Sequence, residues 1–178
     1  MSEAESDLNK RREVLMISLF SDLQSARMNY LYYQRRSDRS RKFALCANVV
    51  SALAGSAVLA GLVSNNIPGG ATAWLGVTGL SVVAAAVGPV FGWEKSAEKQ
   101  AKAAFGFSLV HDRIKGLLRD LKLSELTSDH EARSIEITKL REALSALEDE
   151  APDTSALQKS LDEACESYPS NEKAWNAI

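Results

Sequence analysis

The sequence predicts an all-α protein, in which a two-span transmembrane helical hairpin is continuous with a cytoplasmic helical stalk and is followed by a C-terminal helical tail. The first observation behind this fold class is that no charged residue occurs between Lys42 and Glu94. The second is that apolar residues on both sides of this stretch recur in steps of three and four, the spacing of one helix face. The third is a strong charge asymmetry within a chain of 178 residues whose net charge is only −2.

The charge asymmetry divides the chain into four segments. Residues 1–42 carry nine basic and six acidic residues, residues 43–93 carry neither kind, and residues 94–123 carry seven basic and four acidic residues. Residues 124–178 carry five basic and thirteen acidic residues. We therefore predict a cytoplasmic amphipathic helix over 1–42, the hairpin over 43–93, a second cytoplasmic amphipathic helix over 94–123 and an acidic helical tail over 124–178.

The first helix has a heptad-like apolar seam and a basic end. Its seam consists of Met16, Leu19, Leu23, Ala26, Tyr30 and Tyr33. A basic cluster follows, made of Arg35, Arg36, Arg39, Arg41 and Lys42. Phosphate groups of lipids and the topology of the chain explain this cluster better than nucleic acid does, because the uncharged stretch begins at the next residue. We expect no nucleic-acid partner.

The uncharged stretch contains two runs of membrane-spanning length. Residues 43–63 would span about 31 Å as a helix, which is close to the thickness of a bilayer core. An external loop is expected over 64–71, since SNNIPGG is rich in turn-forming residues. The second span covers 72–93, with Trp74 and Trp93 near its ends, where interfacial aromatics are typical.

Basic residues on both flanks set the expected orientation. Lys95, Lys99 and Lys102 follow the second span, and the loop has no basic residue. The positive-inside rule then places both termini in the cytoplasm. A soluble helical bundle with a buried hairpin is the alternative, but the flanking segments offer few apolar residues to surround two such helices.

Small and polar residues recur along the two spans. Asn48, Ser51, Gly55 and Ser56 are candidates for a pore-facing or helix-contact surface, because small residues four apart let helices approach closely in a membrane. Gly88, Pro89 and Gly92 form a GxxxG with a proline inside it, a candidate packing or hinge site. Packing within one hairpin and packing around an aqueous axis between copies both fit these residues.

The second arm continues the three-and-four spacing, and the tail is expected to hold two helices. The arm's seam consists of Phe107, Val110, Ile114, Leu117 and Leu121. Ser128 and Glu131 have capping-box spacing ahead of Ile137, Leu140, Leu144 and Leu147. Pro152 stops that helix, and Asp153 can cap another that carries Leu157, Leu161, Ala164 and Cys165 and ends before Pro169. The tail either docks on the arms or binds a second protein. Its negative charge favours docking on the positively charged arms, and this makes the tail a candidate control element of the protein.

The sequence contains no recognisable catalytic set, phosphate loop or metal spacing, so we expect neither an enzyme nor a bound cofactor. Cys46 and Cys165 lie far apart and form no disulfide framework. His111 falls off the apolar seam of its arm, so its side chain is expected in solvent.

An amphipathic helix ending in YLYYQRRSDRSRKF, two spans joined by a short loop, and the following WEKSAEKQAKAAFGFSLVHDRIKGLLRDL together resemble the SLATT family over about residues 14–122. These are two-transmembrane effectors associated with bacterial nucleotide-signalling defence systems. The resemblance implies a multi-pass protein of the bacterial inner membrane that an upstream sensor activates, and it offers no catalytic residues. The tail from 123 onward lies outside it.

We therefore expect an antiphage membrane effector that forms a homo-oligomer and permeabilises or depolarises the inner membrane when triggered. The partners expected are the lipid bilayer, further copies of the chain and an upstream sensor or signalling protein. The alternative is a non-conducting membrane anchor or adaptor whose acidic C-terminal tail recruits a partner protein.

Overall fold

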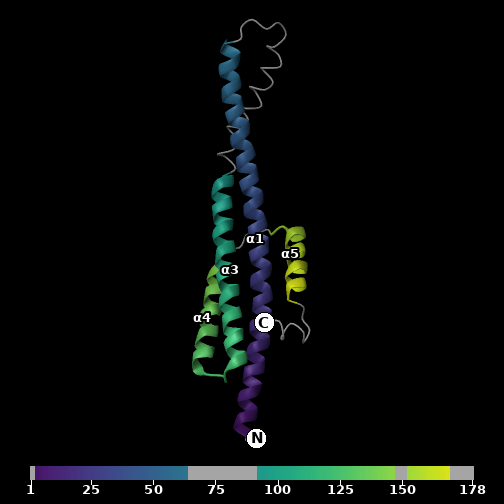
Figure 1. Cartoon of the computed structure of the whole chain (residues 1–178), viewed down its shortest axis with the longest axis vertical. Helices are drawn as coiled ribbons and strands as arrows, with labels where there is room; N and C mark the ends of the chain where they lie inside the picture. Colours follow the sequence, from purple (N-terminus) through teal and green to yellow (C-terminus); the bar gives the residue numbers. More distant parts are fainter. Residues whose placement is uncertain (1–2, 64–91, 147–151, 169–178) are drawn as a thin grey trace. The chain divides into compact units, whose positions relative to one another are not determined.

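The computed structural model describes residues 3–63, 92–146 and 152–168, and the side chains of all of these except 3–5, 50–51 and 53–63. Four helices occupy these ranges: α1 (Glu3–Val63), α3 (Trp93–Leu123), α4 (Ser128–Ser145) and α5 (Thr154–Ser167). The described part of the chain contains no strand (Figure 1). The all-α fold class is confirmed to this extent.

The hairpin is only partly within the described residues. Residues 43–63, the first expected span, belong to α1, which runs without a break from the first amphipathic arm. Residues 64–91, which include the loop and nearly all of the second span, lie outside the described ranges. Among the described helices, none is both long enough and apolar enough to cross a membrane.

The second arm does not continue through Gly92 as expected. α3 begins at Trp93, and Gly92 has a φ of 55°, in the left-handed region that favours glycine. The carbonyl of Gly92 accepts a hydrogen bond from Ser96 N at 2.9 Å, so this residue opens the first turn of α3. The prediction that the second span and its arm form one unbroken helix is therefore wrong at Gly92.

The chain separates into two compact units. The bundle unit comprises Met1–Gln34 and Ala101–Ile178, and the boundary unit comprises Arg35–Gln100. The bundle unit thus joins the two arms and the tail. The boundary unit holds the basic cluster, the uncharged stretch and the start of α3.

In the bundle unit, the two arms pack along their apolar seams. All five predicted residues of the α3 seam are buried, as are Leu19, Leu23, Ala26 and Tyr33 of the α1 seam. Tyr33 stacks on Phe107 with ring centroids 5.7 Å apart, and Arg12 donates to the carbonyl of Leu121 near the end of α3. These two contacts make the helices antiparallel. The guanidinium of Arg12 also satisfies carbonyls that the end of a helix leaves unpaired.

Helix α4 is capped one residue earlier than its sequence indicated. The N-cap is Thr127, and the residue three positions later is His130 rather than Glu131. Thr127 N donates to Nδ1 of His130 at 3.1 Å, which is the return hydrogen bond of a capping box. His130 is buried, with its Nε2 3.4 Å from Ser124 Oγ. An imidazole therefore replaces the expected carboxylate in this cap.

Helix α5 begins at its predicted cap and packs on the core through two of its four predicted residues, Leu157 and Ala164. Asp153 accepts a hydrogen bond from Ala156 N at 3.2 Å, as expected of an N-cap. The buried residues of α5 are Ser160 and Ala164, whereas Leu161 and Cys165 are exposed. Small residues at the contact let α5 approach its neighbours closely. The apolar face predicted through Leu161 and Cys165 is wrong for these two residues.

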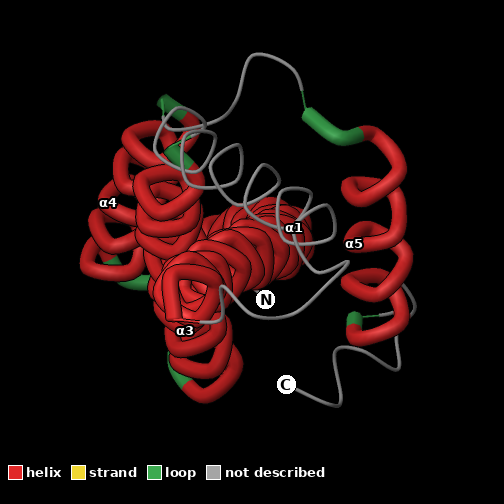
Figure 2. Tube along the Cα trace, turned by 90° about the horizontal axis from the view of Figure 1, so that it is seen from above, coloured by secondary structure: helices red, strands yellow, loops and turns green. Residues whose placement is uncertain are grey.

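The tail docks on the arms within the bundle unit, as predicted from its charge. The ion pairs, however, join basic residues of the tail to acidic residues of the arms. Figures 1 and 2 show α4 and α5 on different sides of the α1–α3 pair. Arg141 of α4 pairs with Asp22 of α1, and Arg133 pairs with Asp120 of α3 at 2.7 Å. The tail supplies the arginine in each of these pairs, so local geometry rather than net charge fixes its position.

Candidate functional site

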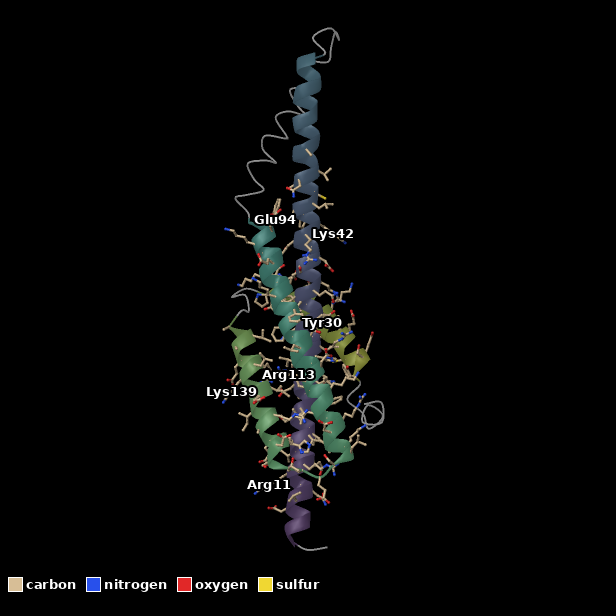
Figure 3. All side chains as sticks on the ribbon, turned by 60° about the vertical axis from the view of Figure 1, so that its left-hand side comes forward. Arg11, Tyr30, Lys42, Glu94, Arg113 and Lys139 are labelled. Atoms are coloured by element: carbon tan, nitrogen blue, oxygen red, sulfur yellow. The ribbon has the colours of Figure 1, made fainter. Side chains whose placement is uncertain are left out.

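The candidate functional site is the part of the boundary unit where the basic cluster meets the uncharged stretch. Residues 35–49 of α1 and residues 93–100 of α3 lie side by side here. Figure 3 shows Lys42 and Glu94 at this level of the two helices. At this site, the last charged residue before the uncharged stretch, Lys42 of α1, and the first charged residue after it, Glu94 of α3, lie on neighbouring helices.

A buried set of polar contacts joins the two helices just before the charges end. Ser37 Oγ donates to the carbonyl of Ala97 at 3.2 Å, and Ser40 Oγ donates to Oε1 of Gln100 at 3.2 Å. Nε2 of Gln100 in turn donates to Ser96 Oγ at 3.1 Å. Ser37 and Gln100 are both buried. Because a buried amide is costly without partners, this network favours one register of the helix pair over others.

Aromatic and aliphatic side chains follow directly after the polar network. The rings of Phe43 and Trp93 lie 6.0 Å apart at the charge boundary. Phe43, Leu45 and Val49 are large apolar residues that remain exposed on α1. An exposed apolar surface of this kind on a helix indicates contact with something other than water.

The basic residues predicted for a membrane boundary surround this level of the helices. Arg39, Arg41, Lys42, Lys95 and Lys99 are exposed, and Arg35 and Arg36 are half-buried. Asp38, Glu94 and Glu98 lie among them and are exposed as well. The arrangement is a charged collar next to an apolar surface.

The predicted pore and hinge residues are described only in part. Asn48 is exposed on α1, whereas the side chains of Ser51, Gly55 and Ser56 lie outside the described residues. Gly88 and Pro89 also lie outside them, and Gly92 is the left-handed residue that precedes α3. The structure thus places Asn48 one turn beyond Leu45 and assigns Gly92 to a helix start.

The polar network was not predicted from the sequence, although Ser37 and Gln100 occupy positions that continue the helical spacing of the two apolar seams. Ser37 follows Tyr33 by four residues, and Gln100 precedes Phe107 by seven, so both continue the apolar seams of the arms. Extending each seam through polar positions would have found them. A polar residue at such a position commonly fixes the register of paired helices at some cost in stability.

A second polar cluster lies in the bundle unit around Tyr168. Its hydroxyl lies 2.8 Å from Nε2 of His111, and its carbonyl accepts from Nε2 of Gln24 at 2.7 Å. Nδ1 of His111 lies 3.1 Å from Oδ1 of Asp112, so a neutral imidazole protonated at Nδ1 lets the tyrosine donate to Nε2. Only 13% of the His111 side chain is exposed, so its expected placement in solvent is wrong.

Burial dominates the electrostatics of the Tyr168 cluster. The pKa of Tyr168 is raised above its usual value, chiefly because burial disfavours the phenolate. The positive charge of Arg27 opposes this increase in pKa, and the negative charge of Asp112 adds to it. The neutral phenol therefore acts as a hydrogen-bonding group that links the end of α5 to both arms.

Across the residues that the structure describes, no group of three or more His, Cys, Asp or Glu side chains could hold a metal ion. The boundary site offers hydrogen bonding, charge and apolar contact through the residues described above. No family model, no curated protein and no solved structure matches the chain.

Proposed function

We propose that the chain is a membrane effector of a bacterial antiphage defence system, in which the 43–93 segment forms a two-span hairpin in the inner membrane. The effector assembles as a homo-oligomer and permeabilises or depolarises the membrane when an upstream sensor or signalling protein triggers it. Both termini lie in the cytoplasm. The resemblance to the SLATT family supplies the defence setting, and no catalytic residue is required for this activity.

The observation that carries the membrane part of the proposal is the change of character at Phe43. α1 continues through this position without a break while its charged residues cease. Phe43, Leu45 and Val49 expose large apolar side chains immediately after exposed Arg41 and Lys42. A helix that passes from headgroups into hydrocarbon requires this order of side chains.

The permeabilising part rests on the composition of the spans. Six alanines, two glycines and two serines make residues 43–63 only moderately hydrophobic. Asn48, Ser51 and Ser56 supply polar groups, and polar residues within a membrane commonly face other helices or water. Such spans fit contact between helices better than contact with lipid alone.

Membrane potential in cells expressing the chain tests this function. A voltage-sensitive dye should report depolarisation that requires intact spans, measured with the chain alone and with its genomic neighbours. Asn48→Leu and Gly88→Leu should reduce the ion flux and toxicity, whereas Ile135→Ser, a change at an exposed residue of α4, should leave both unchanged. Unaltered toxicity and flux in the two span variants would remove the channel mechanism.

Exchanging the hairpin for an unrelated one distinguishes the adaptor from the membrane-disrupting effector. If residues 43–93 serve only as an anchor, an unrelated two-span hairpin will preserve the activity. A membrane-disrupting effector will lose activity in the same exchange. The acidic tail alone gives the adaptor no advantage, because its helices α4 and α5 already contact the arms through Arg141 and Tyr168.

A further inference from the structure

We propose that one face of α1 at the charge boundary binds anionic phospholipids of the cytoplasmic leaflet in preference to zwitterionic ones. The residues that form this face, called the outer row from here on, are Arg35, Arg39, Lys42, Cys46 and Val49. The inference rests on the proposed membrane hairpin and names the class of lipid that the boundary of this hairpin selects.

The outer row lies on the side of α1 that points away from α3. Its members are successively four, three, four and three residues apart, the spacing that keeps side chains on one face of a helix. Ser37 Oγ donates to the carbonyl of Ala97, so the Ser37 side of α1 faces α3. A helix turns by about 100° per residue, which directs Arg39 and Lys42 about 160° and 140° away from Ser37. The outer row is therefore open to the surroundings of the helix pair.

Solvent exposure agrees with this orientation. Arg39 and Lys42 are exposed and Arg35 is half-buried. Cys46 and Val49, the two apolar members of the row, are exposed as well. The same face of one helix thus presents three cations followed by an apolar surface.

The order of side chains along the outer row matches the order of groups in a phospholipid. Val49 lies seven residues beyond Lys42, about 10 Å further along the helix, which is less than the roughly 15 Å of hydrocarbon in one leaflet. The rings of Phe43 and Trp93 lie 6.0 Å apart just past Lys42, and aromatic pairs of this kind are typical of the membrane interface. A phosphate held by the cations would therefore leave its acyl chain beside Cys46 and Val49.

The balance of charge favours an anionic headgroup, and it favours α1 over α3. Residues 35–42 carry five basic residues and one carboxylate, Asp38, whereas residues 93–100 of α3 carry two lysines and two glutamates. Each lysine or arginine close to an anionic membrane surface adds to the attraction. A zwitterionic headgroup carries an ammonium group of its own, which opposes such a row of cations. The excess positive charge of α1 is therefore complementary to anionic lipid.

The lipid selectivity of the full chain tests this site. The purified chain is reconstituted in phosphatidylcholine vesicles that contain a trace of spin-labelled phosphatidylglycerol or of spin-labelled phosphatidylcholine. Electron paramagnetic resonance then measures the fraction of each labelled lipid whose motion the protein restricts. We expect the association constant for phosphatidylglycerol to exceed that for phosphatidylcholine by at least about fivefold, the effect of one or more cations near the headgroup.

Three double variants identify the residues that cause the preference. Arg39→Gln with Lys42→Gln should lower the ratio of the two association constants by at least about threefold, because two cations of the outer row are lost. Arg39→Lys with Lys42→Arg keeps both charges and should keep the ratio. The matched control is Lys115→Gln with Arg119→Gln, which removes the same charge from exposed residues of α3 in the bundle unit and should leave the ratio unchanged.

Equal association constants for the two lipids in the natural chain would overturn the inference, and so would an equal loss of preference in the control. A loss of preference in the charge-conserving exchange would also overturn it, since charge would then not be the cause. Restriction of neither lipid would remove the membrane part of the proposed function together with this site. If the chain restricts phosphatidylglycerol selectively but leaves the membrane potential of cells unchanged, the lipid site stands and the proposed permeabilisation is removed.

Discussion

At the scale of single residues, Tyr168 contacts both arms from the end of α5. Its ring meets Phe20 edge-on with centroids 6.4 Å apart, and its hydroxyl and carbonyl reach His111 and Gln24. One residue thus connects the end of α5 to both α1 and α3. These contacts hold α5 in place together with partly buried Leu157 and the small buried residues Ser160 and Ala164.

Alkaline pH should weaken the bundle unit through Tyr168. The folded state raises the pKa of this phenol, so the folded chain keeps the proton to a higher pH than the unfolded chain. The associated stability is complete below about pH 10 and is lost as the pH rises through the raised folded pKa. Urea unfolding from pH 8 to 11 should show a steeper loss of stability above pH 10 for the natural chain than for Tyr168→Phe. Identical profiles would contradict this assignment.

Asp153 should stabilise α5 through its cap. Asp153→Ala removes the acceptor of the Ala156 N–H and should cost about 1 kcal/mol in the free energy of unfolding. Asp153→Asn keeps an acceptor oxygen and should cost much less. Denaturant unfolding of the two variants measures the difference, and equal losses would show that the carboxylate acts through its charge instead.

At the scale of elements, close approach decides how the tail packs on the arms. Leu144 of α4 lies against Gly106 of α3, and α5 presents Ser160 and Ala164 to its neighbours. The polar network around Gln100 has a similar role in the boundary unit, where it fixes one register of α1 against α3. Both contacts depend on small or specific side chains rather than on hydrophobicity alone.

Two glycines of α3 provide a matched test of this packing. A Cβ at Gly106 would lie 2.4 Å from Cδ2 of Leu144, whereas a Cβ at Gly116 would meet nothing within 4 Å. Gly116→Ala should stabilise the helix by about 1 kcal/mol, the usual difference in helix propensity. Gly106→Ala gains the same propensity but must displace Leu144, a cost of about 1–3 kcal/mol. Thermal unfolding of the monomeric chain in detergent should therefore rank Gly116→Ala above Gly106→Ala, and the reverse order would contradict the packing.

At the scale of the whole molecule, the proposed function depends on a change of solvent along α1. The bundle unit buries the apolar seams of both arms, while the boundary unit carries a charged collar and then exposed apolar residues. The resemblance to a family of membrane effectors and the moderate hydrophobicity of the 43–63 segment both agree with assembly in a membrane. The change of solvent is evident only from the order of charged and apolar residues along α1, and not from any one residue.

Charge introduced beyond the collar should impair membrane insertion. Leu45→Glu and Val49→Glu place carboxylates on the exposed apolar surface of α1, where desolvation in hydrocarbon would disfavour them. We expect less of each variant in the carbonate-resistant membrane fraction. Ile135→Glu, at an equally exposed apolar residue of α4, should partition like the natural chain. Full retention of the two α1 variants in the membrane would contradict the proposed boundary at Phe43.

The sequence by itself determined the helical class, the two apolar seams and the tail helices, because the spacing of apolar residues and the residues Asp153 and Pro152 depend only on local chemistry. It also located the charge boundary at Phe43. It did not determine the cap of α4, where His130 takes the place expected for Glu131, since Thr127 and Ser128 are both competent N-caps.

Only the tertiary structure decided which faces meet. Burial of Gln100 and Ser37, the contact of His111 with Tyr168 and the packing of Leu144 on Gly106 all join residues far apart in sequence. The direction of the tail's ion pairs was decided in the same way, because Arg141 meets Asp22 only once α4 lies on α1. Helical periodicity reveals that a face is apolar, but the partner of that face depends on the three-dimensional fit of side chains.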